Sequence, residues 1–200
     1  MSDEPVVRRG FVESELVAEH PGLWLAWTEV ATRGGASPPD VRRRLSGLAD
    51  RMHGSAAIAL RSREVPHAYR VFFRHVGLDP DRVRTPPEAA ALRRMQEGGL
   101  RSRGLVDDAL TIAVLETGVG VSAFDAEALD GGLGLRLDGA TIVIADAGGR
   151  VAVLFGEPVQ RAAVGRHTQR VALVAVAVPN VPELFVQEAL WTAWEILRAE

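Results

Sequence analysis

The sequence lacks two residue types that commonly carry chemistry. It contains no cysteine, which excludes disulfides, thiolate catalysis and zinc held by Cys ligands. It also contains no lysine, because all 23 of its basic residues are arginine. Arginine makes bidentate contacts with phosphate and carboxylate groups that lysine cannot make. A GC-rich genome explains the same bias, so the arginines alone identify no partner.

Long hydrophobic runs and a basic charge balance are also missing. The most apolar stretch, "VALVAVAVPNVP" at 171–182, is too short to span a bilayer and contains Pro179. The first residues, "MSDEPVVRRGF", lack the hydrophobic segment of a signal peptide. The formal net charge is −3, so no overall positive field indicates nucleic acid. We therefore expect a cytoplasmic protein that does not contact a membrane.

The remaining composition is typical of a globular protein. Of the 200 residues, 47% are hydrophobic and 24% are charged. No linker and no internal repeat is evident, so we predict one domain over residues 1–200.

The first half of the sequence predicts strands followed by helices. Residues 11–31 are typical of one or two strands. Helical spacing of apolar residues then predicts helices over 41–52, 66–77, 85–98 and 106–117. In the third of these, Thr85 and Glu88 have the spacing of a capping box, and Leu92 and Met95 form the expected apolar side.

The second half changes character. Short β-branched runs separated by Gly, Asp or Glu predict strands within 118–124, 132–137, 141–146, 151–156 and 170–178. A final helix should begin at Asn180 and bury Leu184, Trp191 and Trp194. Because strands and helices occur in blocks and do not alternate, the pattern predicts an α+β fold.

Several common enzyme signatures are absent. The sequence has no Walker motif, no dinucleotide-binding turn and no G-x-S-x-G elbow. Its five histidines show no metal-ligand spacing, so we expect no metal and no cofactor. Two structural roles for acids are more common than catalysis. Asp107 and Asp108 would complement the dipole of the helix they begin, and Asp125 would cap the turn that follows it.

One ordered set of motifs resembles a known family. The segment "EAAALRRMQEGGLRSRGLVDDALTIAVLETGVGVSAFDAEALDGGLGLRL" contains Arg93–Arg94 and Gly98 at a helix end, then Asp108 in the next helix. It continues with Gly118, Ala123–Phe124–Asp125, Gly131 and Arg136. This order is similar to the editing module of the phenylalanyl-tRNA synthetase β-subunit, the paired third and fourth B domains, which also occurs as free-standing proteins. The best match covers 85–137, and a looser one extends from 23 to 200.

The resemblance implies a fold and an activity. The fold would be α+β, with a β-sandwich-like core of unusual topology flanked by helices. The activity would be hydrolysis of the ester that joins a wrong amino acid to tRNA, which protects translation fidelity. Residues 105–137 would form one wall of the pocket.

The resemblance also assigns roles to residues. Asp108, Thr111 and Ser122 would be catalytic, and Gly118, Gly120, Ala123, Phe124 and Asp125 would bind substrate. Water would attack the ester, and backbone N–H groups near Gly118 and Gly120 would stabilise the oxyanion. Arg93, Arg94 and Arg101 would contact tRNA phosphates; alternatively, Arg93 or Arg94 pairs with Glu88 or Glu97.

Three positions depart from the family pattern. Thr111 stands where the family has Asn, and Ser122 stands where it has His. The late strand at 170–178 lacks the Glu that recognises a tyrosine hydroxyl in the synthetase. A site without that acceptor loses its discrimination for tyrosine, so a smaller or more apolar amino acid would suit it better.

Three interpretations follow from these departures. The chain is an editing deacylase acting in trans, a tRNA-binding or amino-acid-binding module without the reaction, or a protein that binds an unrelated small ligand. The sequence indicates neither the amino acid nor an oligomeric state.

Overall fold

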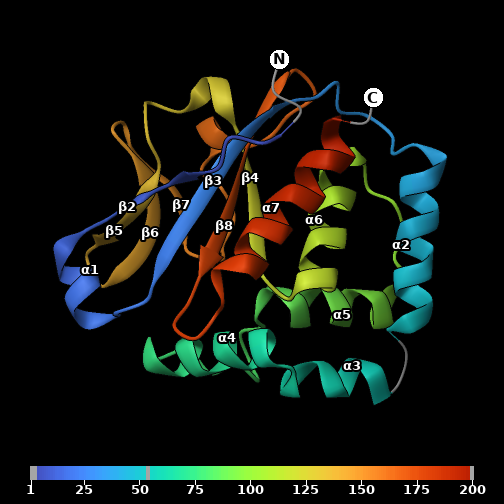
Figure 1. Cartoon of the computed structure of the whole chain (residues 1–200), viewed down its shortest axis with the longest axis horizontal. Coiled ribbons are helices and arrows are strands. Elements are labelled where there is room, and N and C mark those ends of the chain that lie inside the picture. The colour runs from blue at the N-terminus through green and yellow to red at the C-terminus, as the bar shows by residue number, and fades with distance from the viewer. Residues whose placement is uncertain (1–3, 53–54, 199–200) are drawn as a thin grey trace.

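The computed structural model describes residues 4–52 and 55–198, except for the side chains of Ala57 and Arg94. The chain forms eight strands within these ranges (Figure 1): β1 (Arg8–Arg9), β2 (Phe11–Val12), β3 (Trp24–Ala31), β4 (Gly120–Asp125), β5 (Gly134–Asp138), β6 (Thr141–Asp146), β7 (Gly149–Val153) and β8 (Arg170–Ala177). The helices are α1 (Ser14–Glu19), α2 (Pro39–Arg51), α3 (Ser55–Ala59), α4 (Glu64–His75), α5 (Pro86–Glu97), α6 (Leu105–Thr117) and α7 (Glu183–Arg198). Short 3-10 turns are η1 (Leu60–Ser62), η2 (Ala126–Ala128) and η3 (Gln160–Ala162).

The strands form two sheets. The central sheet has the order β1-β3-β8-β4 and is antiparallel throughout. The second sheet has the order β2-β5-β6-β7, in which only β2 and β5 run parallel. Gly10 lies between β1 and β2, where the chain passes from one sheet to the other. A Cβ at Gly10 would stand 2.3 Å from Cδ1 of Leu25, so this close approach of the two sheets requires glycine.

Helices cover one side of the central sheet, and the second sheet lies on its other side (Figure 1). Helix α7 packs on β3 and β8, α6 packs on α7, and α2 packs on α6. Helices α3, α4 and α5 lie across the end of this arrangement. The mixed architecture of two sheets and helices confirms the predicted α+β class.

The position of strand β8 explains why apolar and polar residues do not alternate in the sequence at 171–177. All residues from Val171 to Ala177 are buried. The strand lies between β3 and β4 and has helices on one face and the second sheet beyond the other. A strand buried on both faces needs apolar side chains at every position, not only at alternate ones. For the same reason, the strand contains no acidic residue.

The secondary structure agrees with most predicted elements and corrects one. The predicted strands after residue 118 and the helices at 41–52, 85–98 and 106–117 all form. Residues 11–31 instead hold β2, helix α1 and β3. Helix α1 has six residues, and only Leu16 among them is buried. A helix this short shows too little apolar periodicity to be identified from the sequence.

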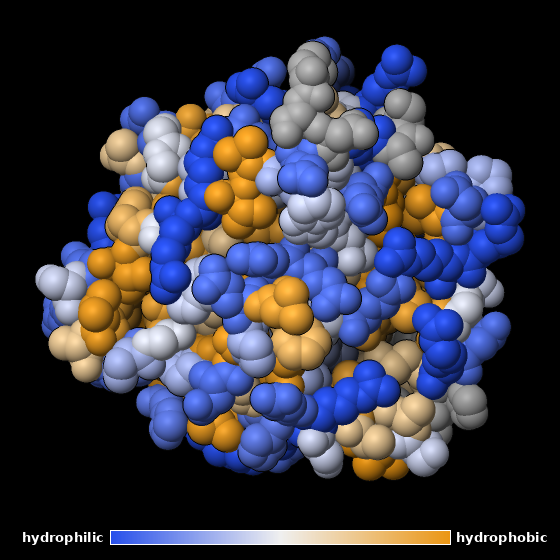
Figure 2. Space-filling model, in the orientation of Figure 1, coloured by the Kyte–Doolittle hydropathy of each residue, from blue (hydrophilic) through white to orange (hydrophobic). Residues whose placement is uncertain are grey.

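One predicted apolar face is wrong, and a second is wrong at one residue. In α5, Leu92 and Met95 are exposed, and the buried side of that helix holds Glu88, Ala90 and Ala91. In α7, which begins three residues after Asn180, Trp194 is buried and Trp191 is half-buried, but Leu184 is 69% exposed. Figure 2 shows apolar and polar side chains interspersed across the viewed face.

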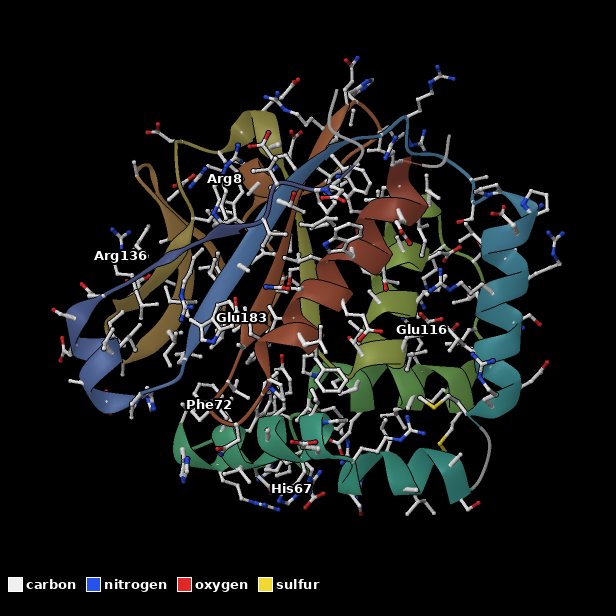
Figure 3. The ribbon with its side chains drawn as sticks, in the orientation of Figure 1. Arg8, His67, Phe72, Glu116, Arg136 and Glu183 are labelled. Carbon is white, nitrogen blue, oxygen red and sulfur yellow. The ribbon has the colours of Figure 1, made fainter. Side chains whose placement is uncertain are left out.

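Helix α4 separates a buried face from an exposed one. Phe72 points toward the sheets, whereas His67 points away from them (Figure 3). The hydroxyl of Tyr69, also on the buried face, reaches the central sheet. Helix α4 thus closes the end of the central sheet where β4 begins.

None of the helices within the described ranges combines the length and apolarity needed to cross a bilayer.

Candidate functional site

The segment 105–137 is a continuous unit of α6, β4, η2 and β5. Helix α6 ends at Gly118, which adopts a left-handed conformation with φ of 79° and donates its N–H to the carbonyl of Val114 at 2.9 Å. A Cβ at Gly118 would stand 2.9 Å from Cδ of Pro66. Both the backbone conformation and the contact with α4 therefore require glycine here.

Asp108 is a buried anchor. One of its carboxylate oxygens accepts hydrogen bonds from the hydroxyls of Ser37 at 2.6 Å and Ser102 at 2.5 Å. The other oxygen accepts the N–H of Arg103 at 3.0 Å. These bonds tie the β3–α2 loop, the α5–α6 loop and α6 together. The carboxylate is thus engaged in holding loops, beyond the helix-dipole role that the sequence indicates.

Thr111 brings two sets of predicted residues into contact. Its hydroxyl donates to the carbonyl of Asp107 at 2.8 Å and accepts from Nη2 of Arg93 at 2.8 Å. Arg93 therefore contacts a predicted catalytic residue and not Glu88 or Glu97. For Arg94, pairing with one of these acids stays a prediction. Glu88 pairs with Arg70 and Arg61, and Glu97 pairs with Arg103.

Ser122 is half-buried in the edge strand β4, opposite Val174 of β8. Among the described residues, its hydroxyl has no hydrogen-bond partner, so no described histidine activates it as a nucleophile. The cavities of about 640, 200 and 150 Å³ formed by described residues are not lined by Asp108, Thr111 or Ser122. A pocket shared by these three residues stays a prediction.

The two glycines expected to stabilise an oxyanion already use their N–H groups. Gly118 donates to Val114, and Gly120 donates to the hydroxyl of Tyr69 at 3.0 Å. That hydroxyl in turn donates to the carbonyl of Val176, the register partner of Gly120. Burial raises the pKa of Tyr69, so the phenol stays protonated and keeps this bridge. These two N–H groups are therefore not available to an oxyanion, and a contribution from N–H groups near them stays a prediction.

The three residues that follow Ser122 pack within the protein or hold turns in place. Ala123 is half-buried, and Phe124 is buried in the core. Asp125 accepts the N–H of Glu127 at 3.1 Å, which confirms that it caps the following turn. Its second oxygen accepts the hydroxyl of Thr168 at 2.8 Å and so fixes the loop before β8.

The predicted tRNA-contacting arginines have different surroundings. Arg101 is exposed and has no partner among the described residues. The side chain of Arg94 lies outside the described part of the structure. Phosphate contact by either residue stays a prediction.

A cavity of about 640 Å³ lies where three loops meet, and the sequence did not indicate it. Its walls come from the β3–α2 loop, the α5–α6 loop with the first turn of α6, and the η3–β8 loop. The glycines at 34, 35, 104 and 165 are the only local signal, and glycine-rich loops are common. The side chains that line it include Thr32, Arg103, Asp107, Arg166 and Thr168.

Two ion pairs with buried carboxylates hold the surrounding elements together. Arg70 of α4 donates to Glu88 at 2.6 Å and to Asp81 at 2.9 Å, and Thr85 donates its hydroxyl to Glu88 at 2.8 Å. Thr85 and Glu88, the predicted capping box, thus form a side-chain pair that also holds α4.

The second pair joins β6 to η3. Asp146 accepts two hydrogen bonds from Arg161, at 2.8 and 3.0 Å, and one from the N–H of Asp130 at 3.0 Å. Burial opposes ionisation of Asp146, but the Arg161 guanidinium together with the N–H groups of Asp130 and Gly148 outweighs it and holds the pKa of the carboxyl below its ordinary value.

Among the described residues, no group of three His, Asp or Glu side chains is arranged to hold a metal ion. Comparison with protein-family models gives no match to this chain, and comparison with curated proteins gives none either.

Proposed function

We propose that this chain binds the aminoacylated acceptor end of tRNA and hydrolyses the ester of a wrongly attached amino acid. The ordered motifs at 85–137 support this proposal. The contact between Arg93 and Thr111 carries it furthest, because it joins a predicted tRNA-binding residue to a predicted catalytic one. The two sheets and their helices would then be a variant of the editing-module fold, and the chain would work in the cytoplasm.

The chemistry would rely on a positioned water. Ser122 lacks a basic partner among the described residues, and a serine without a base is a weak nucleophile. Its hydroxyl is available to orient a water or the terminal ribose, and it can donate to a developing oxyanion where the Gly118 and Gly120 N–H groups cannot. Thr111, held by Arg93, would contribute the second hydroxyl.

The side chains of strand β8 are relevant to which amino acid the site would accept. Val174 lies directly opposite Ser122, so the strand offers no side-chain acceptor for a tyrosine hydroxyl. Sites built to bond a hydroxyl owe their discrimination to that acceptor. We therefore propose a small or apolar amino acid as the group removed.

A deacylation assay across a panel of aminoacyl-tRNAs tests this function. The intact protein should release one small or apolar amino acid faster than the others, and Ser122→Ala should slow release by roughly tenfold to a thousandfold without abolishing it. Mass spectrometry of protein incubated with a slow ester substrate tests the mechanism. An acyl group trapped on Ser122 would rule out direct attack by water.

A second candidate function is tRNA binding without hydrolysis. The observation favouring it is that Asp108, Gly118 and Gly120 are all occupied by bonds within the protein. Filter binding with bulk tRNA separates the two candidates. Retained binding, together with no release of any amino acid from the panel, would establish the binding module and eliminate the deacylase.

A further inference from the structure

Strand β4 directs half of its backbone groups away from the central sheet. It forms one edge of that sheet, and β1 forms the other (Figure 1). The hydroxyl of Tyr69 joins the N–H of Gly120 to the carbonyl of Val176, so the backbone groups of Gly120 face β8. Neighbouring residues of an antiparallel strand direct their backbone groups to opposite sides. Val121 and Ala123 therefore direct theirs outward.

The pairing on the other side of β8 gives the same alternation. The carbonyl of Leu25 accepts the N–H of Gly10 at 2.9 Å, so the backbone groups of Leu25 face β1. Val176 is the register partner of Leu25 in β8, and its backbone groups consequently face away from β3, toward β4. Both sides of β8 thus assign the outward groups of β4 to the same residues.

These outward groups have no partner within the described ranges. Neither the N–H nor the carbonyl of Val121 and Ala123 forms a hydrogen bond there, and the same holds for the N–H of Asp125. Helix α5 and η3 approach β4, but the described residues of these two elements donate no hydrogen bond to the strand and accept none from it. Val121, Ser122 and Ala123 are each partly exposed, so solvent reaches this edge.

The other three sheet edges in the described structure are protected. Strands β1 and β2 have two residues each, and β1 consists of Arg8–Arg9. Strand β7 pairs irregularly with β6, and its outer side accepts the N–H of Val159 at the carbonyl of Val151. Short strands, charges and bulges are the usual protection of an edge against another chain. Strand β4 has six residues in regular register, without proline or a basic residue, and its one charge is Asp125 at its end.

The β4 edge is complementary to itself. An antiparallel pairing centred on Ala123 places Ala123 opposite the same residue of a second copy, and Val121 opposite the partner subunit's Asp125. Outward-facing residues then oppose outward-facing residues, as an antiparallel ladder requires. Only methyl groups meet at the two-fold axis, and no like charges stand directly opposite each other. Such a contact uses the same surface on both chains, so it closes with two copies.

We propose that two copies of this chain pair through β4 and join their central sheets into one continuous sheet. Ser122 would stand opposite the partner subunit's Phe124, which has no polar atom in its side chain, so the Ser122 hydroxyl stays without a side-chain partner. The two-fold axis would place Ser122 of both copies on the same face of the continuous sheet. This pairing does not rest on the proposed function.

Sedimentation of the intact protein over a series of concentrations tests the pairing. Wild type should form dimers that dissociate on dilution. Ala123→Pro should weaken dimerisation by roughly tenfold or more, because proline lacks the N–H that the partner strand would bond. Proline is compatible with an edge position whose N–H faces outward, so the single chain should keep its thermal midpoint. Arg9→Pro is the matched control, since Arg9 precedes the inward-facing Gly10 on the other edge of the same sheet, and it should leave dimerisation unchanged.

A charge exchange at residue 123 tests the register. Ala123→Lys and Ala123→Asp would each place like charges opposite each other at the two-fold axis, so each variant alone should dimerise several-fold more weakly than wild type. An equimolar mixture of the two variants should associate again, because opposite charges then face each other. Misfolding of either variant cannot produce this rescue.

Three results would overturn the proposal. The first is a wild-type protein that stays monomeric at the highest concentration at which it is soluble. The second is a dimer whose dissociation constant is the same in wild type, Ala123→Pro and both charge variants, because another surface would then hold it. The third is a mixture of the charge variants that associates no better than each variant alone, which would exclude the pairing centred on Ala123.

Discussion

The hydroxyl oxygen of Thr111 accepts a hydrogen bond of 2.8 Å from Nη2 of Arg93. The same hydroxyl donates to the carbonyl of Asp107 one turn earlier in α6. This second bond fixes the direction of the hydroxyl hydrogen. The lone pairs of the hydroxyl oxygen are therefore left to accept from Arg93. The contact links α5 to α6 and places a guanidinium beside a predicted catalytic position.

Thr111→Val should remove this contact while keeping the shape of the side chain. We expect hydrolysis of the preferred aminoacyl-tRNA to slow by roughly tenfold to a thousandfold, because a positioning hydroxyl is lost. Thr111→Ser keeps the hydroxyl and should retain most of the activity. Equal rates for the Val and Ser variants would show that the hydroxyl has no part in the reaction.

The Tyr69 hydroxyl bridges a gap in the central sheet, between the N–H of Gly120 and the carbonyl of Val176. Tyr69→Phe should lower the free energy of unfolding by about 1–3 kcal/mol, the cost of leaving buried partners unsatisfied. Denaturant titration measures this loss. Amide hydrogen exchange at Gly120 should also accelerate, and unchanged exchange there would mean that β4 pairs directly with β8 without the bridge.

Gly118→Ala tests the turn between α6 and β4. The left-handed backbone alone should cost about 1–2 kcal/mol for an L-residue, and the contact with Pro66 adds to it. Gly98→Ala is the matched control, because Gly98 has a similar φ of 68° and no atom within 4 Å of the position that a Cβ would occupy. Thermal unfolding should therefore show a larger loss for Gly118→Ala. Equal losses would assign the whole effect to backbone conformation.

The Asp146–Arg161 pair should make stability depend on acid pH. The folded pKa of Asp146 lies below its ordinary value of about 3.9, so the ionised form stabilises the fold above that value. The stabilisation is lost as pH falls through the lower, folded pKa. Asp146→Asn should cost about 1–3 kcal/mol at neutral pH and flatten the decline in acid. Denaturation midpoints measured between neutral and acid pH give the stability loss at neutral pH and the decline of stability in acid. If the variant loses stability in acid as steeply as wild type, other carboxylates cause that decline.

Local signals in the sequence were sufficient for much of the fold. The end of α6 at Gly118 could be predicted because glycine tolerates the left-handed conformation of a helix terminus. The cap at Asp125 followed from the same kind of local chemistry. These features depend on residues a few positions apart, which a sequence displays directly.

Features that depend on distant residues could not be predicted. Asp108 accepts a hydrogen bond from Ser37, which lies far away in the sequence, so its anchoring role was invisible. Leu92 and Met95 have helical spacing, but tertiary packing buries the opposite side of α5, where Glu88 meets Arg70 of another helix. The occupied N–H of Gly120 likewise depends on Tyr69 of α4.

The position of β8 between β3 and β4 has a consequence for synthesis on the ribosome. Both neighbouring strands pair with β8 and not with each other, and β8 is the last of the described strands to be made. Nascent chains that end before Arg170 therefore lack the partner that both strands need. Such chains should remain sensitive to proteases across β3 and β4, whatever helices have already formed. Protection of these strands should then arise together, in one cooperative step that follows the synthesis of β8.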